Sequence, residues 1–135
     1  MPDTQQPPGK GSGAVVRSAN DVEFNSIPAG RGAAIQVLIG PALGHTTYVT
    51  RRFRLEPGGS IPTHTNDVEH QQYVLRGRGR ITIDGVPHDV GPDDTLFIPA
   101  GVPHSYEVLR GPFEFLCIVP DAPDQLRFLE PPARC

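Results

Sequence analysis

The chain has 135 residues, of which 37% are hydrophobic and 20% are charged, and its formal net charge is −3. This length fits one domain with a single hydrophobic core. The net negative charge and the pI near 5.9 argue against a nucleic-acid or anionic-membrane partner. No apolar run is long enough to cross a bilayer, and the N-terminus lacks a secretion signal, so we expect a cytoplasmic protein.

Composition divides the chain into two short tails and one domain. Residues 1–13, MPDTQQPPGKGSG, are polar and rich in proline and glycine, and we expect them to be disordered. Residues 14–120 are assigned to the domain, and residues 121–135 to a C-terminal tail with room for one helical turn near residues 123–128. A disulfide between Cys117 and Cys135, the last residue of the tail, is not expected in a reducing compartment.

Short apolar stretches bounded by glycine, proline, asparagine or aspartate follow one another through the domain. They are rich in β-branched and aromatic residues, and none shows helical periodicity. The Asp84-Gly85 pair predicts a tight hairpin turn. The expected strands are residues 33–40, 46–56, 70–77, 79–85, 95–101, 104–111 and 113–120. Many short strands with turn signals between them predict an all-β sandwich or barrel.

Histidines are grouped in a way that favours a metal site in such a barrel. His64 and Asn66 are two residues apart and therefore share one face of an extended strand. His70 joins them if the strand resumes after a turn, and His104 follows a later strand. A single buried histidine is usually a satisfied core residue, but several buried rings all need partners for both nitrogens. A metal ion supplies one such partner to every ring.

At these positions the sequence resembles the small single-domain cupins, which have an RmlC-like jelly-roll fold. Their first motif, G-x5-H-x-H-x3/4-E-x6-G, is matched in spacing by Gly58, His64, Asn66, His70 and Gly77. Their second motif, P-x-G-x2-H-x3-N, is matched by Pro99, Gly101 and His104, with Val108 in place of the asparagine. The resemblance covers roughly residues 35–120. It implies a cupin jelly-roll barrel or sandwich that binds one divalent metal ion and forms a homodimer.

Two positions depart from the usual cupin pattern, because Asn66 replaces a histidine and His70 replaces the glutamate. A subgroup with the pattern H-x-H-x-x-x-H is more similar to this chain, and it implies His64, His70 and His104 as metal ligands. Asn66 then contributes a weak oxygen ligand, leaves an open position for water, or marks a site that has lost its function. The ion stays open among Fe, Mn, Zn, Ni and Cu, since imidazole binds many of these metals.

Four further residues are candidates for the chemistry. Gln72 and Tyr106 continue the inward faces of their strands and are candidate catalytic residues, although both also suit a packed barrel wall. By the resemblance, Arg52 is a candidate to bind a substrate carboxylate, with a surface arginine as the alternative. Cys117 is a candidate to line the substrate cavity, with a structural cysteine as the alternative.

These features predict a metal-dependent enzyme that acts on a small polar or anionic molecule. A redox metal suits a dioxygenase, and Zn, Mn or Ni suits an isomerase, lyase or decarboxylase. The alternatives are a ligand-binding or metal-binding module without turnover, and a vestigial dimeric scaffold. In a homodimer, a strand near residues 14–27 is expected to add to the partner's sheet and cover its edge.

Overall fold

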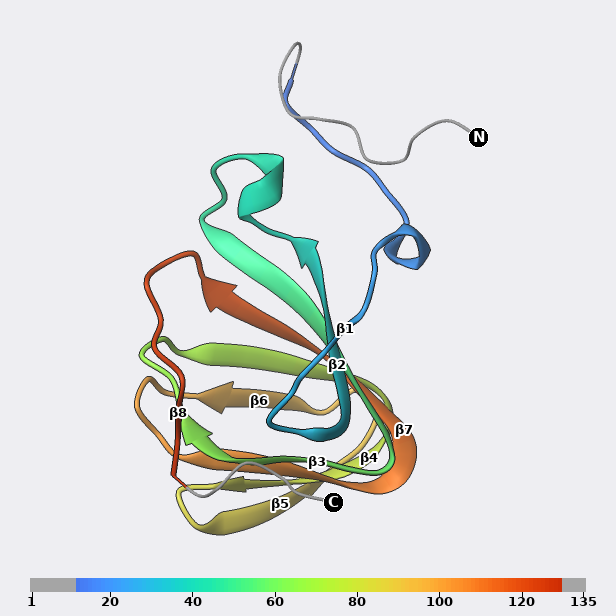
Figure 1. The fold of residues 1–135 in the computed structure, drawn as a ribbon, viewed down its shortest axis with the longest axis vertical. Coiled ribbons are helices and arrows are strands. Elements are labelled where there is room, and N and C mark those ends of the chain that lie inside the picture. Colours follow the sequence, from blue (N-terminus) through green and yellow to red (C-terminus); the bar gives the residue numbers. More distant parts are fainter. Residues whose placement is uncertain (1–11, 130–135) are drawn as a thin grey trace.

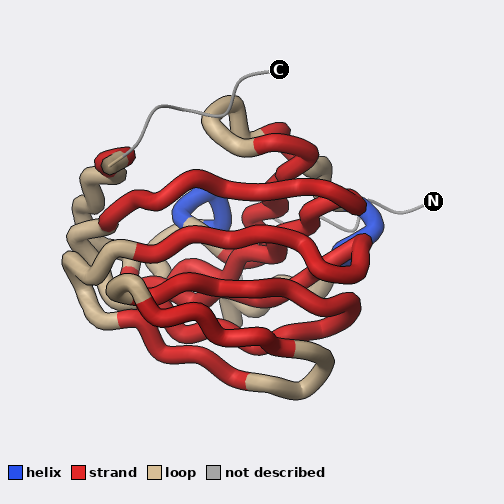
Figure 2. Tube along the Cα trace, turned by 90° about the horizontal axis from the view of Figure 1, so that it is seen from below, coloured by secondary structure: helices blue, strands red, loops and turns tan. Residues whose placement is uncertain are grey.

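The structure is a computed structural model that describes residues 12–129. Strands dominate it, and helix is confined to two single turns, η1 (Ala19–Asp21) and η2 (Pro41–Leu43) (Figure 2). The strands are β1 (Asn25–Ser26), β2 (Arg31–Ile39), β3 (Tyr48–Thr65), β4 (His70–Ile83), β5 (Val86–Val90), β6 (Thr95–Ile98), β7 (His104–Pro120) and β8 (Arg127–Phe128). The predicted all-β fold is confirmed. Among the described residues, no helix is long and apolar enough to cross a membrane.

One antiparallel sheet folds back on itself to make two walls. Its strand order is β1-β2-β3-β7-β4-β5, with β6 beside β4 and β8 beside β3. Residues 48–55 of β3 pair with residues 113–120 of β7 in one wall, and residues 60–64 pair with residues 104–107 in the other. Figure 1 shows β3, β4 and β7 turning at the side of the molecule opposite β8. This arrangement is the jelly roll that the sequence predicts.

Glycine and proline mark bends inside long strands rather than strand ends. Residues 70–77 and 79–85 were expected as two strands, but residues 70–83 form one strand, β4. Likewise β7 joins the two strands expected at residues 104–111 and 113–120. Strand pairing continues across each bend with a shift in register, so no loop is needed. The glycine and proline residues lie where the sequence predicts a break, but they mark bends within strands and do not end them.

The bends pack so closely that a side chain does not fit between them. Gly77, the last residue of the first motif, has a φ of +76°, and a Cβ there would lie 2.2 Å from the backbone oxygen of Pro112. A Cβ on Gly111 would lie 2.6 Å from the backbone nitrogen of Pro57. The bends of β3, β4 and β7 therefore stack on one another, and glycine is required where their backbones touch.

The interior follows the alternation of the strands. Four side chains on one face of β7 are buried, namely Phe113, Phe115, Cys117 and Val119. The rings of Phe53, Phe115 and Tyr106 form a continuous stack, with centroids 5.0 and 5.1 Å apart along it. The predicted hairpin is also confirmed, since Asp84 and Gly85 both have positive φ, 50° and 81°.

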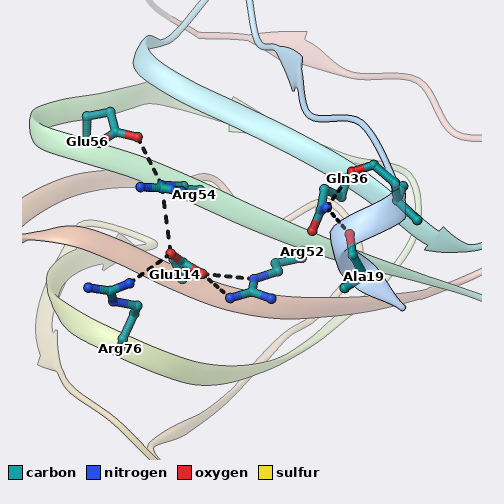
Figure 3. Close-up of polar contacts among 8 residues, drawn as sticks. Ala19, Gln36, Arg52, Arg54, Glu56, Arg76 and Glu114 are labelled. Atoms are coloured by element: carbon teal, nitrogen blue, oxygen red, sulfur yellow. Dashed lines mark hydrogen bonds and ion pairs between the residues drawn. The ribbon is translucent and has the colours of Figure 1, made fainter. Parts of the chain in front are cut away.

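Both ends of the described chain differ from expectation. Residues 14–27 do not form one strand, because only Asn25–Ser26 is extended and paired, as β1. The side chain of Gln36 on β2 donates to the backbone oxygens of Ala19 and Val22 over 2.8 and 2.7 Å. This ties the segment to its own chain (Figure 3). The helical turn expected near residues 123–128 is also absent, because β8 pairs with residues 64–65 of β3. The disorder predicted for residues 1–13 falls almost entirely outside the described residues.

Candidate metal centre

Three strands bring the predicted histidines together at one end of the barrel. His64 lies near the end of β3, and His70 and His104 are the first residues of β4 and β7. His64 and His104 are direct neighbours across the β3–β7 pair. The ring centroid of His104 lies 4.3 Å from that of His64 and 5.4 Å from that of His70. All three side chains are buried.

Hydrogen bonds fix which ring nitrogens remain available. Nδ1 of His64 lies 2.8 Å from the Pro62 carbonyl oxygen, and Nδ1 of His104 lies 3.0 Å from that of Val102. A carbonyl only accepts, so Nδ1 carries the proton in both rings and Nε2 keeps a free lone pair. Nε2 of His104 and both nitrogens of His70 are buried without a hydrogen-bond partner. Buried nitrogens without a partner in the protein are available to a metal ion.

Burial keeps these rings in the form that binds metal. Desolvation lowers the pKa of His64, even though the Pro62 hydrogen bond raises it in part. Desolvation, followed by the charge of Arg51, lowers the pKa of His70 to about 3, and desolvation lowers that of His104 to about 4. All three imidazoles are therefore neutral at neutral pH, and no proton has to leave before a metal ion binds.

The side-chain amide of Asn66 has one defined orientation. Its Nδ2 donates to Oδ2 of Asp124 over 3.0 Å, and a carboxylate can only accept, so the amide orientation is determined. Its Oδ1 then faces the other way, where it is buried without a partner. The second oxygen of Asp124 accepts the backbone N–H of Asp67 over 2.6 Å, which holds the carboxylate in position.

These nitrogen and oxygen atoms are of types that bind divalent metal ions, although their present positions do not form a complete coordination site. Within residues 12–129, no group of three or more His, Cys, Asp or Glu side chains is arranged to hold a metal ion as it stands. No hydrogen bond holds the ring of His70 in its orientation. Neutral imidazole nitrogens and an amide oxygen are accepted donors for first-row divalent metals.

A cavity of about 180 Å³ opens beside the histidines. One end is polar and includes His64, His70, Asn66 and Gln72. The apolar part of the lining is formed by Ile27, Ile35, Phe53, Ile61, Leu126 and Phe128. The C-terminal segment contributes Leu126 and Phe128, so the tail forms part of the cavity wall.

Gln72, Tyr106 and Cys117 all line this cavity, as the sequence predicts. Nε2 of Gln72 donates to the hydroxyl oxygen of Tyr106 over 2.6 Å and approaches Sγ of Cys117 at 3.4 Å. Burial raises the pKa of Tyr106, so its phenol remains protonated. These three side chains therefore form one connected polar patch on the wall next to the histidines.

Arg52 does not line the cavity, which corrects the position expected for a substrate-binding arginine. Its guanidinium is bound to the buried carboxylate of Glu114, with Nε 2.8 Å from Oε1. Figure 3 shows this carboxylate among three arginines, Arg52, Arg54 and Arg76. The arginine in the cavity wall is the preceding residue, Arg51.

The sequence does indicate that Arg51 faces the interior. Val49, Arg51, Phe53 and Leu55 alternate along β3, so the three apolar residues identify the face that Arg51 shares. Asp124 had no such local signal, because it meets Asn66 across 58 positions of the sequence.

Comparisons with known proteins decide the family. A family model described as "Cupin domain" matches residues 51–119, half of the chain, which includes all three histidines. The chain belongs to the cupin family.

This cupin is 41% identical over 54 residues, 40% of the chain, to the HTH-type transcriptional activator RhaS of Mannheimia succiniciproducens. It is 33% identical over 73 residues, 50% of the chain, to oxalate decarboxylase OxdC of Bacillus subtilis. The matches span 20% and 19% of those two proteins, about a fifth of their lengths.

Among solved structures, the cupin is similar to the polyketide cyclase RemF from Streptomyces resistomycificus. The TM-score is 0.76 at 29% identity, and the match covers 84% of this chain and 83% of that one. This likeness extends over nearly the whole of both chains, unlike the partial matches to the two longer proteins.

Proposed function

We propose that this cupin is a metal-dependent enzyme that acts on a small organic anion. His64, His70 and His104 would hold one divalent ion, with the oxygen of Asn66 as a further donor. The observation that supports this proposal is the set of buried donor atoms without partners: Nε2 of His104, both nitrogens of His70 and Oδ1 of Asn66. When bound, the ion would supply positive charge that polarises a substrate oxygen.

The protein's own contribution centres on Tyr106. Its hydroxyl oxygen accepts the hydrogen bond from Gln72, so its proton is left to donate to a bound molecule. Because burial raises its pKa, the phenol holds this proton at neutral pH. Tyr106 is thus suited to donate a hydrogen bond, while keeping its proton, to negative charge that develops on the substrate. Gln72 would position the hydroxyl.

This arrangement favours non-redox chemistry, such as an isomerase, lyase or decarboxylase reaction, over a dioxygenase. A hydrogen-bond donor beside a polarising ion suits such reactions, since both stabilise negative charge that develops on one substrate. Two similar proteins, a polyketide cyclase and an oxalate decarboxylase, have names that agree with this class.

A ligand-binding module without turnover is the second candidate. The similarity to a transcriptional activator favours it, since 54 residues of this chain match that protein at 41% identity. In that case the cavity would bind the same class of molecule and release it unchanged.

The test is to load the purified protein with Zn²⁺, Mn²⁺, Ni²⁺ or Fe²⁺ and to follow a panel of small organic acids by NMR, under argon and in air. Conversion under argon is expected, and Tyr106→Phe should keep the metal while losing at least tenfold in rate. Conversion that requires O₂ would favour the dioxygenase. Binding without conversion by any loaded form would favour the ligand-binding module and contradict the enzyme.

A further inference from the structure

Arg51 carries a charge that the protein leaves uncompensated. Its Nη2 donates to Sγ of Cys117 over 3.0 Å, which is a weak acceptor, and its Nε is buried without a partner. Its guanidinium also lies over the ring of Phe53, 5.1 Å from the centroid. Within residues 12–129, none of the ion pairs involves Arg51.

The neighbouring arginines of β3 show the contrast. Arg52 is bound to Glu114, and Arg54 lies 3.0 Å from Glu56, both on the outer face of the strand. Arg51 lines the cavity beside Cys117, and its charge contributes to the low pKa of His70. A guanidinium on a cavity wall with free donors is a binding site for an anion, above all a carboxylate.

The remainder of the cavity determines what the anion is attached to. Ile27, Ile35, Ile61, Leu126 and Phe128 provide no donor or acceptor for a second charged group. The volume of about 180 Å³ equals roughly six water molecules at ~30 Å³ each, so the ligand is small. A wall of this kind disfavours a compact dianion such as oxalate, which has no apolar surface to bury.

We propose that Arg51 is the anion-binding residue of the cavity, and that its ligand is an organic monocarboxylate with a compact apolar body, an aryl or branched-alkyl acid. The carboxylate binds the guanidinium, and the apolar body lies against the isoleucines and Phe128. This inference deepens the proposed function and rests on it for the role of the ligand as substrate. The binding itself depends on Arg51 and does not require the metal ion.

Titration calorimetry with benzoate, isovalerate, benzamide and oxalate tests the proposal on metal-free and Zn²⁺-loaded protein. Arg51→Met should weaken benzoate binding at least tenfold, because it removes a charge-assisted hydrogen bond from a partly desolvated site. Benzamide, which is neutral and of the same shape, should bind the native protein at least tenfold more weakly than benzoate. Arg80→Met is the matched control, since Arg80 pairs with Asp89 on the outer surface; it should bind benzoate normally.

Arg51→Lys guards against a folding defect, since it keeps the charge and should retain part of the affinity. The proposal is overturned if neither benzoate nor isovalerate binds, or if Arg51→Met binds benzoate as tightly as the native protein. It is also overturned if oxalate binds the metal-free protein more tightly than benzoate. It is also overturned if benzoate binding disappears with the metal, because the ion would then be the anion site. Arg51-dependent binding in a protein that takes up no metal would instead refute the proposed function and leave this inference intact.

Discussion

At the scale of single residues, the pair Asn66–Asp124 gives the asparagine a defined role. An amide that is free to flip would offer either a donor or an acceptor to the cavity. The carboxylate of Asp124 removes that choice by accepting from Nδ2, which leaves Oδ1 buried without a partner. A partner that orients a ligand in this way is an outer-shell contribution to a metal site.

Replacing Asp124 with alanine should therefore weaken metal binding by about tenfold, the lower end of the effect of losing an outer-shell partner. Competition with a chromophoric chelator measures the affinity. Asp121→Ala is the control, because Asp121 is exposed in the same segment and bonds Thr46 instead. Equal affinities in the two variants would show that the orientation of Asn66 does not matter to the metal.

The three buried histidines should make the metal-free protein sensitive to acid. Their pKa values are lowered in the folded state, to about 3 for His70 and about 4 for His104. Between those values and the unfolded value near 6.5, the unfolded chain binds more protons than the folded one. The free energy of unfolding should thus fall as the pH falls from about 6.5 towards 4. Urea titrations at several pH values measure this slope, and His70→Leu should flatten it; an unchanged slope would contradict the burial argument.

At the scale of elements, the stacked bends of β3, β4 and β7 determine where the histidines meet. At each bend a strand crosses from one wall to the other, and His64 and His104 are paired in the wall that contains residues 60–64 and 104–107. Position 77 requires glycine for two reasons. Its φ is positive, and the backbone of Pro112 occupies the space that a side chain would need.

Gly77→Ala should accordingly lower the free energy of unfolding by about 3 kcal/mol or more, since left-handed strain and a backbone clash add. Gly85→Ala is the matched control: Gly85 has a similar φ, +81°, but nothing lies within 4 Å of an added Cβ. It should lose about 1–2 kcal/mol, the cost of the backbone conformation. Similar losses in the two variants by urea denaturation would mean that the bends do not pack as described.

The sequence predicted elements well where the signal was local and poorly where partners were distant. The Asp84-Gly85 pair, for example, identified the hairpin. Nothing near residues 123–128 indicated a strand, because β8 exists through pairing with β3, about 60 positions earlier. The contact of Asp124 with Asn66 could not be predicted for the same reason. The position of Arg51 in the cavity wall was missed, although the alternation along β3 indicates it.

At the scale of the whole molecule, the homodimer remains a prediction, and the outer face of the sheet is where we expect it. Tyr73 and Phe97 are 42% and 57% exposed there, and Ile118 lies with them around one shallow hollow. Exposed apolar groups gathered in this way are typical of an interface. Light scattering should give about twice the chain mass of 14.6 kDa, and Phe97→Asp should shift the protein towards monomer. A monomeric native protein would refute the prediction.

The most direct test of the metal centre is the metal content of the protein after incubation with a divalent metal and removal of excess ion. Elemental analysis should find one equivalent in the native protein. It should find at least tenfold less in His70→Ala and His104→Ala, with circular dichroism confirming that both variants are folded. A native protein that retains no metal from any of Fe²⁺, Mn²⁺, Zn²⁺, Ni²⁺ and Cu²⁺, or variants that retain as much as the native protein, would contradict the assignment of these histidines as ligands.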